Sequence, residues 1–151
     1  RPGTLGIATG MVVGLAAVTP ASGFITPLAA MFLGAVAAPL SYYAIKFRSR
    51  RQLDESLDVW ACHGIASTWG MLATGLFATA AVNGDGANGL FFGNPGQVGI
   101  QVLAVLVTIG FAFGVTYVIA KALNASIGLR VTPMEEEVGL DLSSHGERSY
   151  S

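Results

Sequence analysis

The chain has 151 residues, of which 52% are hydrophobic and only 11% are charged, and its mean hydropathy is +0.60. Soluble domains carry about 25% charged residues, so this composition excludes an ordinary soluble domain and predicts an all-α integral membrane protein. The net charge of −1 argues against a nucleic-acid partner, and the single cysteine, Cys62, excludes an intrachain disulfide and a thiolate metal cluster.

Four apolar stretches predict four transmembrane helices, because about 20 apolar residues suffice to cross the hydrocarbon core of a bilayer. A polar break at Thr19–Gly23 separates the first two. The predicted spans are residues 4–18, 24–47, 57–82 and 97–123, the last extending up to a turn further. The membrane region is thus residues 1–129, and residues 130–151 form a polar carboxy-terminal tail.

The basic residues predict the orientation, because short cytoplasmic loops are enriched in Lys and Arg. The segment that follows the second span holds Lys46, Arg48, Arg50 and Arg51. The loops at Thr19–Gly23 and Asn83–Gly96 contain no Lys or Arg, which places them outside. The tail is therefore predicted to lie in the cytoplasm.

Small residues predict close packing of these helices, since helices in lipid associate through them rather than by hydrophobic exclusion. Gly6, Gly10 and Gly14 fall on one stripe of the first span, and Gly110 and Gly114 repeat the spacing in the fourth. The pattern indicates a compact multi-helix bundle and nothing more specific.

His63 is the most informative residue, because no Asp, Glu, Lys or Arg lies between Asp58 and Asp85. A titratable side chain inside a membrane span is a functional-site candidate by default. Two other interpretations remain open, a structural hydrogen bond to a neighbouring carbonyl and a haem ligand. Asp58 lies near the positive end of a helix dipole, which favours a structural role over a catalytic one.

Other polar and bulky residues allow two interpretations each. Thr19 precedes Pro20, and its hydroxyl can bond its own turn or a ligand. Val12 lies two turns earlier on the same face, where it can line a lumen or pack in the core. Trp69 is interpreted as a helix-packing residue whose indole N–H needs a partner. In the tail, Thr132 is a predicted N-cap for a short helix that starts with acidic residues.

Two long motifs resemble signatures of the ammonium transporter family, which includes the Rhesus-type proteins. The stretch D-V-W-A-C-H-G-I-A-S-T-W-G-M-L-A-T-G-L-F-A, from Asp58 to Ala78, is similar to the tenth helix of that family. The tail G-L-R-V-T-P-M-E-E-E-V-G-L-D-L-S-S-H-G-E-R-S-Y is similar to its cytoplasmic carboxy-terminal signature. The resemblance maps the four spans onto the last four of eleven helices, so we expect the chain to be the carboxy-terminal portion of such a protein.

The resemblance implies a homotrimer in the plasma membrane, in which each subunit conducts ammonium or ammonia through a narrow hydrophobic pore without covalent chemistry or a cofactor. His63 aligns with the second of two hydrogen-bonded pore histidines. Val59 aligns with an apolar residue at the inner end of the pore, and Thr19 with a hydroxyl of the external recruitment site. Asp58 aligns with a structural carboxylate.

The resemblance also implies that the tail packs beneath its own and the neighbouring subunit, coupling the trimer, and that a cytoplasmic signalling protein of the PII type can plug the inner mouth. The tail residues assigned to regulation on this basis are Gly139, Leu140, Asp141, His145, Gly146 and Glu147.

Three alternatives stay open. An ammonium sensor would share the pore, and a Rhesus-type gas channel would differ in the tail, which here is more similar to the microbial and plant branch. A transporter of another class, with a structural histidine, would be expected to show broken helices or further intramembrane charges.

Overall fold

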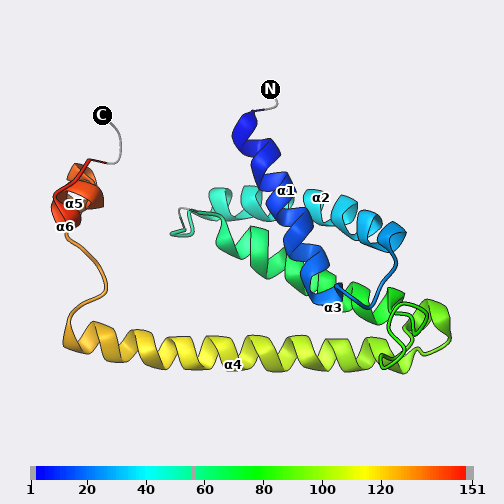
Figure 1. The fold of residues 1–151 in the computed structure, drawn as a ribbon. Helices are drawn as coiled ribbons and strands as arrows, with labels where there is room; N and C mark the ends of the chain where they lie inside the picture. The colour runs from blue at the N-terminus through cyan, green and yellow to red at the C-terminus, as the bar shows by residue number, and fades with distance from the viewer. Residues whose placement is uncertain (1–2, 56, 149–151) are drawn as a thin grey trace. The chain divides into compact units, whose positions relative to one another are not determined.

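The computed structural model describes residues 3–55 and 57–148, which contain helices and no β-strand (Figure 1). The longer helices are α1 (Thr4–Val18), α2 (Pro27–Arg51), α3 (Ala66–Phe77) and α4 (Gly96–Ser126). The short ones are η1 (Thr19–Ala21), η2 (Trp60–Ile65), η3 (Leu90–Phe92), α5 (Pro133–Val138) and α6 (Leu140–His145). The chain divides into two compact units, Arg1–Val107 and Thr108–Ser151. The last three residues of the predicted tail, 149–151, lie outside the described residues.

The second predicted span starts later and ends later than residues 24–47. The hydroxyl of Thr26 accepts the backbone N–H of Ala29 at 3.3 Å, and Pro27 occupies the first helical position. This combination of N-cap and proline starts a helix well. At the other end, Gln52 adopts φ 51°, and its backbone N–H bonds the last carbonyls of the helix. Such a left-handed residue ends the helix after Arg51.

The third predicted span, residues 57–82, is shorter in the structure and is wound in two ways. It begins as the π-helical turn η2 and continues as α3, which has 12 residues. After Phe77 the chain turns away, and the N–H of Thr79 bonds the Phe24 carbonyl at 2.9 Å. The polar interactions of this turn, rather than hydropathy, set the end of the helix, so the prediction that it reaches residue 82 was wrong.

Three helical stretches are long and apolar enough to cross a membrane: Thr4–Ala21, Pro27–Arg51 and Gly96–Ser126. These correspond to the first, second and fourth predicted spans, which are confirmed as helices of spanning length. The segment formed by η2 and α3 is not among these stretches, and its α-helical part has only 12 residues.

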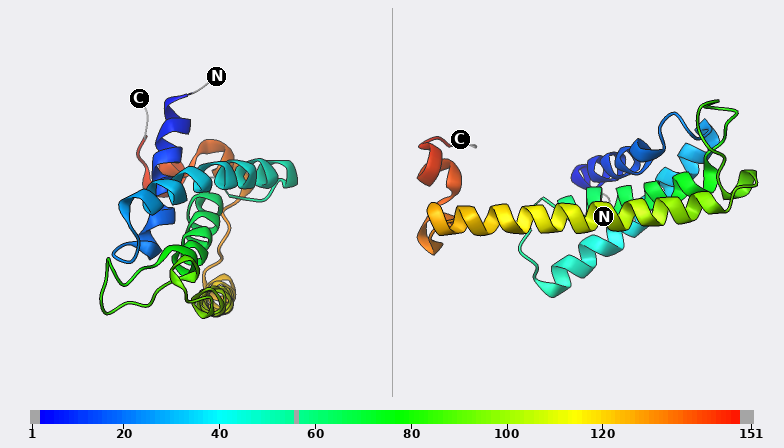
Figure 2. Two further views of the ribbon diagram at one scale, coloured as in Figure 1. Left: turned by 90° about the vertical axis from the view of Figure 1, so that its right-hand side faces the viewer. Right: turned by 90° about the horizontal axis from the view of Figure 1, so that it is seen from below.

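In the first unit, α1, α2 and α3 pack against one another, and the further views agree (Figure 2). Their core consists largely of small side chains, among them Ala17, Ala37 and Ala66, each 0% exposed. At Gly70 a Cβ atom would lie 1.9 Å from the Ala17 carbonyl oxygen, so α3 approaches α1 closely only because that side chain is absent. Small residues thus allow the close helix contacts that lipid favours.

The predicted glycine stripe of α1 is only partly used within this chain. A Cβ atom on Gly14 would meet the Cα of Gly34 at 3.9 Å, an ordinary contact with α2. A Cβ atom on Gly6 or Gly10 would meet nothing within 4 Å. The close crossing therefore lies at the Gly14 end of the stripe.

In the second unit, the predicted short helix of the tail is confirmed as α5, and Thr132 is its N-cap. The Thr132 hydroxyl accepts the N–H of Glu135 at 3.3 Å, and the Glu135 carboxylate accepts the Thr132 N–H at 2.7 Å. This is a reciprocal capping box. These bonds from the Thr132 backbone and side chain lower the pKa of Glu135 below its ordinary value.

We expect the capping box to open in acid. Because the pKa of Glu135 is lower in the folded tail than in the unfolded tail, its stabilising contribution is complete above the unfolded value of about 4.3. That contribution is lost as the pH falls through the lower, folded value. Hydrogen exchange at the Glu135 and Glu136 amides should therefore accelerate below that range, after correction for intrinsic exchange. In Glu135→Gln, which keeps an acceptor but does not titrate, this acceleration should disappear; an unchanged acid response would contradict the assignment.

Candidate functional site

His63 lies within η2, a single π-helical turn that leads directly into α3. Such turns are rare and often occur at functional sites. The start of η2 is fixed to the end of α2. The Asp58 carboxylate lies 2.8 Å from Nε of Arg48, and the same guanidinium donates to the Glu55 carbonyl. The Glu55 carboxylate in turn accepts the N–H of Trp60, so charged side chains hold the entrance to the turn that carries His63.

Asp58 itself adopts φ 53°, in the left-handed region that few residues other than glycine occupy. Its carboxylate is engaged by Arg48, and its backbone carbonyl accepts the N–H of Cys62 at 2.8 Å. These contacts tie Asp58, at the base of the helix, to α2 and to the turn that follows it. Asp58 also borders the hollow described next.

Two adjoining hollows between α1 and the η2–α3 segment share Val12 and His63, and together they form what we call the His63 groove. One hollow has a volume of about 420 Å³, and the other about 270 Å³. The first is lined by Leu5, Ala8, Thr9, Val12, Leu57, Asp58, Val59, Cys62 and His63. The second is lined by Val12, Leu15, Ala16, Thr19, His63 and Ser67.

The groove brings together the four residues that the sequence predicts for conduction. Val59 and Val12 line the larger hollow, Val12 and Thr19 line the smaller one, and His63 belongs to both. His63 is exposed, and Val12 and Val59 are 44% and 50% exposed, so their side chains are available to the hollow rather than used in the core.

Several wall residues were not predicted from the sequence, although a signal for them exists. The additional residues from α1 are Leu5, Ala8, Thr9, Leu15 and Ala16. Together with Val12 and Thr19 they recur every three or four residues, which is the spacing of one helix face. Ser67 lies one turn after His63 on the same side, and that spacing was also visible in the sequence.

The groove contains few polar side chains, and its hydroxyl groups already donate hydrogen bonds to backbone carbonyls. The Thr19 hydroxyl donates to the Leu15 carbonyl at 2.7 Å, and the Ser67 hydroxyl donates to the Ala16 carbonyl at 3.2 Å. Among the described residues, none forms a hydrogen bond with the His63 side chain. A neutral imidazole offers one acceptor and one donor nitrogen. His63 is therefore the side chain best placed to bind a small polar molecule in the His63 groove.

Two further residues lie where packing predicts. Cys62 is buried in the core beside Val13 and Ala66. The indole N–H of Trp69 donates to the Leu33 carbonyl at 3.1 Å, which matches its interpretation as a helix-packing residue. Within the described ranges, no three His, Cys, Asp or Glu side chains gather into a group that could hold a metal ion.

The tail residues assigned to regulation lie in the second unit. Gly139 joins α5 to α6 with φ 98°, and Gly146 ends α6 with φ 68°. Leu140, Asp141 and His145 lie on α6 itself, and the N–H of Glu147 bonds the Asp141 carbonyl at 3.0 Å. The positive φ angles explain why glycine stands at both ends of α6.

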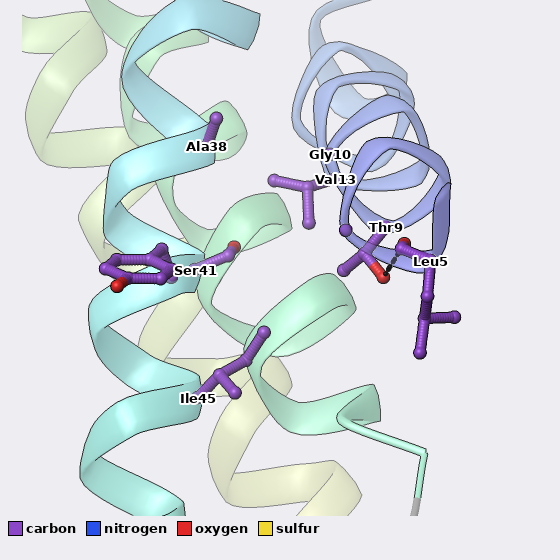
Figure 3. Close-up of a pocket in the computed structure, with 9 residues that line it drawn as sticks. Leu5, Thr9, Gly10, Val13, Ala38, Ser41 and Ile45 are labelled. Atoms are coloured by element: carbon purple, nitrogen blue, oxygen red, sulfur yellow. Dashed lines mark hydrogen bonds between the residues drawn. The ribbon is translucent and has the colours of Figure 1, made fainter. Parts of the chain in front are cut away.

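A separate groove of about 320 Å³ lies between α1 and α2 (Figure 3). Its lining includes Leu5, Thr9, Val13, Ser41 and Ile45 and is mostly apolar. The Thr9 hydroxyl is occupied by a bond to the Leu5 carbonyl at 2.9 Å (Figure 3). None of the residues predicted for conduction lines this groove, so it is not the candidate site.

The fold and the His63 groove define a class: a helical protein with three candidate membrane spans and a histidine in a mostly apolar groove between its helices. The chain matches the Ammonium Transporter Family over residues 1–150. It therefore belongs to the Ammonium Transporter Family.

Relatives and solved structures agree with that membership. The chain is 49% identical to "Ammonium transporter Amt1" of Archaeoglobus fulgidus over 151 residues, which is 100% of this chain and 38% of the relative. It is 42% identical to "Ammonium transporter" of Bacillus subtilis, covering 99% of this chain and 37% of the relative. The crystal structure of Saccharomyces cerevisiae Mep2 matches with a TM-score of 0.85 at 28% identity, over 100% of this chain and 36% of that one. The chain thus spans little more than a third of the length of these proteins.

Loss of the Arg48–Asp58 pair should destabilise the protein, since both side chains are less than one-third exposed. Arg48→Gln leaves a partly buried carboxylate without its cation, and we expect a cost of about 1–2 kcal/mol in the free energy of unfolding, between the values for surface and buried pairs. The matched control is Arg130→Gln, which breaks the more exposed Arg130–Glu136 pair at 3.2 Å. Unfolding in detergent measures both variants, and equal losses would contradict a special role for Arg48.

Proposed function

We propose that this chain is part of an ammonium transporter and that the His63 groove forms one wall of its conduction path. The observation that carries the proposal is that His63, Val59, Val12 and Thr19, chosen from the sequence, line two adjoining hollows that share His63 and Val12. Membership of the Ammonium Transporter Family and the printed names of two relatives at 49% and 42% identity support the same conclusion.

The selectivity of such a path follows from its apolar walls. An ammonium ion loses its hydration shell on entry, and the cost of moving a bare charge through hydrocarbon is very high. Neutral ammonia does not carry that cost. A neutral His63 can accept a hydrogen bond from ammonia or take a proton from ammonium, and the Thr19 hydroxyl, which lines the smaller hollow, can still accept a hydrogen bond.

Metal cations are rejected for a related reason. Potassium and sodium would need oxygen ligands or a compensating negative charge in the groove. Asp58 borders the larger hollow, but its carboxylate is already neutralised by Arg48 at 2.8 Å. The groove therefore offers a hydrogen bond to a small amine and little to a bare cation.

The architecture that we propose for the intact protein is the eleven-helix bundle, of which this chain supplies the last four helices. Together, η2 and α3 extend about 25 Å at a rise of about 1.5 Å per residue or slightly less, which approaches the thickness of a hydrocarbon core. They would serve as the third of these spans. We further propose a homotrimer in the plasma membrane, with the carboxy-terminal tail in the cytoplasm.

The tail is proposed to couple subunits and to meet a PII-type signalling protein at the cytoplasmic face. Its order supports a specific role: α5 has a complete capping box, and α6 is bounded by two glycines at positive φ. A tail that was merely solvated would not need these features. The residues proposed to act in coupling are Gly139, Leu140, Asp141, His145, Gly146 and Glu147.

Replacing the proposed pore histidine is the direct test of transport. In the intact protein, we expect His63→Ala to lower uptake of labelled methylammonium at least tenfold or to admit potassium, because the only imidazole of the groove is lost. Uptake is normalised to the amount of protein in the membrane. If ammonium flux and potassium rejection both remained at their original values, the proposal would be refuted.

Truncation after Arg130 tests the tail separately. Removing α5 and α6 should reduce uptake while leaving insertion into the membrane intact, because the candidate membrane spans all end before Arg130. Membrane abundance serves as the control measurement. Full transport activity in the truncated protein would show that the tail has no coupling role.

A further inference from the structure

One buried hydrogen bond links α2 to the turn that carries His63. The hydroxyl of Ser41, on α2, donates to the backbone carbonyl of Ala61, on η2, at 2.7 Å. Ser41 is 1% exposed and Ala61 is 0% exposed, so water does not reach either group. Figure 3 shows the Ser41 side chain directed from α2 toward the neighbouring helix.

This bond has a specific physical consequence for a π-helical turn. Backbone carbonyls in a membrane protein need a partner inside the protein, because lipid offers none. A π-turn shifts the hydrogen-bond ladder by one residue, and neighbouring side chains can satisfy the groups that the shift frees. Ser41 bonds a carbonyl within Trp60–Ile65, the six residues of the turn. The hydroxyl therefore ties a backbone carbonyl of this turn to α2.

The winding of η2 decides where His63 points. An α-helix has 3.6 residues in each turn, and a π-turn has more, so a change of winding rotates the side chains along the turn. The next helix cannot absorb that rotation easily. On α3, Trp69 donates to the Leu33 carbonyl at 3.1 Å, and Ser67 donates to the Ala16 carbonyl at 3.2 Å. The entrance to the turn is likewise held by the Arg48–Asp58 pair.

From these contacts we propose that Ser41 is a positioning residue that orients His63 toward the His63 groove by holding η2 in its π winding. Ser41 does not act on the substrate itself, since it lines the groove between α1 and α2 and not the one that contains His63. The inference rests on the proposed function for its link to transport, but its structural part concerns only the orientation of one side chain.

The experiment compares three variants in the intact, membrane-embedded protein. Ser41→Ala removes the donor, and Ser41→Thr keeps it, with the groove of about 320 Å³ beside the added methyl group. Thr74→Val is the matched control, because it removes another buried hydroxyl, one that bonds the Gly70 carbonyl within α3 at 2.9 Å. Two quantities are measured: the rate at which diethyl pyrocarbonate modifies His63, read by mass spectrometry, and the ratio of methylammonium uptake to potassium leak.

We expect Ser41→Ala to change the modification rate of His63 at least threefold and to lower the uptake ratio at least fivefold. Ser41→Thr should restore both quantities, and Thr74→Val should leave the modification rate unchanged. A merely structural hydroxyl would lower the amount of folded protein without altering how reagent reaches the imidazole. If Ser41→Ala does not reach the membrane, the weak donor in Ser41→Cys replaces it and should give a smaller change in the same direction.

Each remaining outcome distinguishes the two claims. An unchanged His63 modification rate in the donor-deficient variant, with or without loss of uptake, overturns the positioning role. A changed rate in that variant, together with unchanged ammonium flux and unchanged potassium rejection in His63→Ala, supports the positioning role and refutes the proposed function instead.

Discussion

The structure depends on one constraint: a polar group that enters a hydrocarbon layer must find its partner within the protein. The described part of the first unit shows how this is met. Three side chains each donate a hydrogen bond to a backbone carbonyl of a neighbouring helix: Ser41, Ser67 and Trp69. The small core side chains allow the helices to come close enough for such short reaches. Close helix packing and the hydrogen bonding of buried polar groups therefore depend on each other.

Within that arrangement His63 is the exception that gives the groove its chemistry. Its ring is exposed to the hollow, while the hydroxyls around it have their protons directed into helix carbonyls. The charged pair at the base of η2 is internally neutral, and the Glu55 carboxylate beside it accepts the Trp60 N–H. This combination of an imidazole open to the groove and a neutralised carboxylate is the basis of the ammonia path that we propose.

Much of this could be predicted from the sequence, because the signals are strong and local. Continuous apolar runs gave the first span with the same bounds as α1, and the Thr132 capping box was visible as a threonine followed three residues later by a glutamate. The lack of charge around His63 identified the candidate site. Its four proposed conduction residues line two adjoining hollows because two helix faces with regular spacing meet there.

Other features could not be predicted, because they depend on tertiary contacts. The π winding of η2 is one of these features: Ser41 bonds Ala61 within the turn and Arg48 pairs with Asp58 at its start, contacts between residues 20 and 10 apart in sequence. The third span ends early because Thr79 bonds Phe24 across a turn. The glycine stripe of α1 suggested contact along its whole length, yet only Gly14 meets α2 within this chain. Hydropathy carries no information on any of these.

The most direct measurement is an experimental structure of the intact protein in a lipid nanodisc. We expect the His63 ring to border a narrow, continuous lumen whose wall includes Val12, Val59 and Thr19. A ring that faced lipid, or that lay in a closed seam between helices with no lumen beside it, would contradict the account.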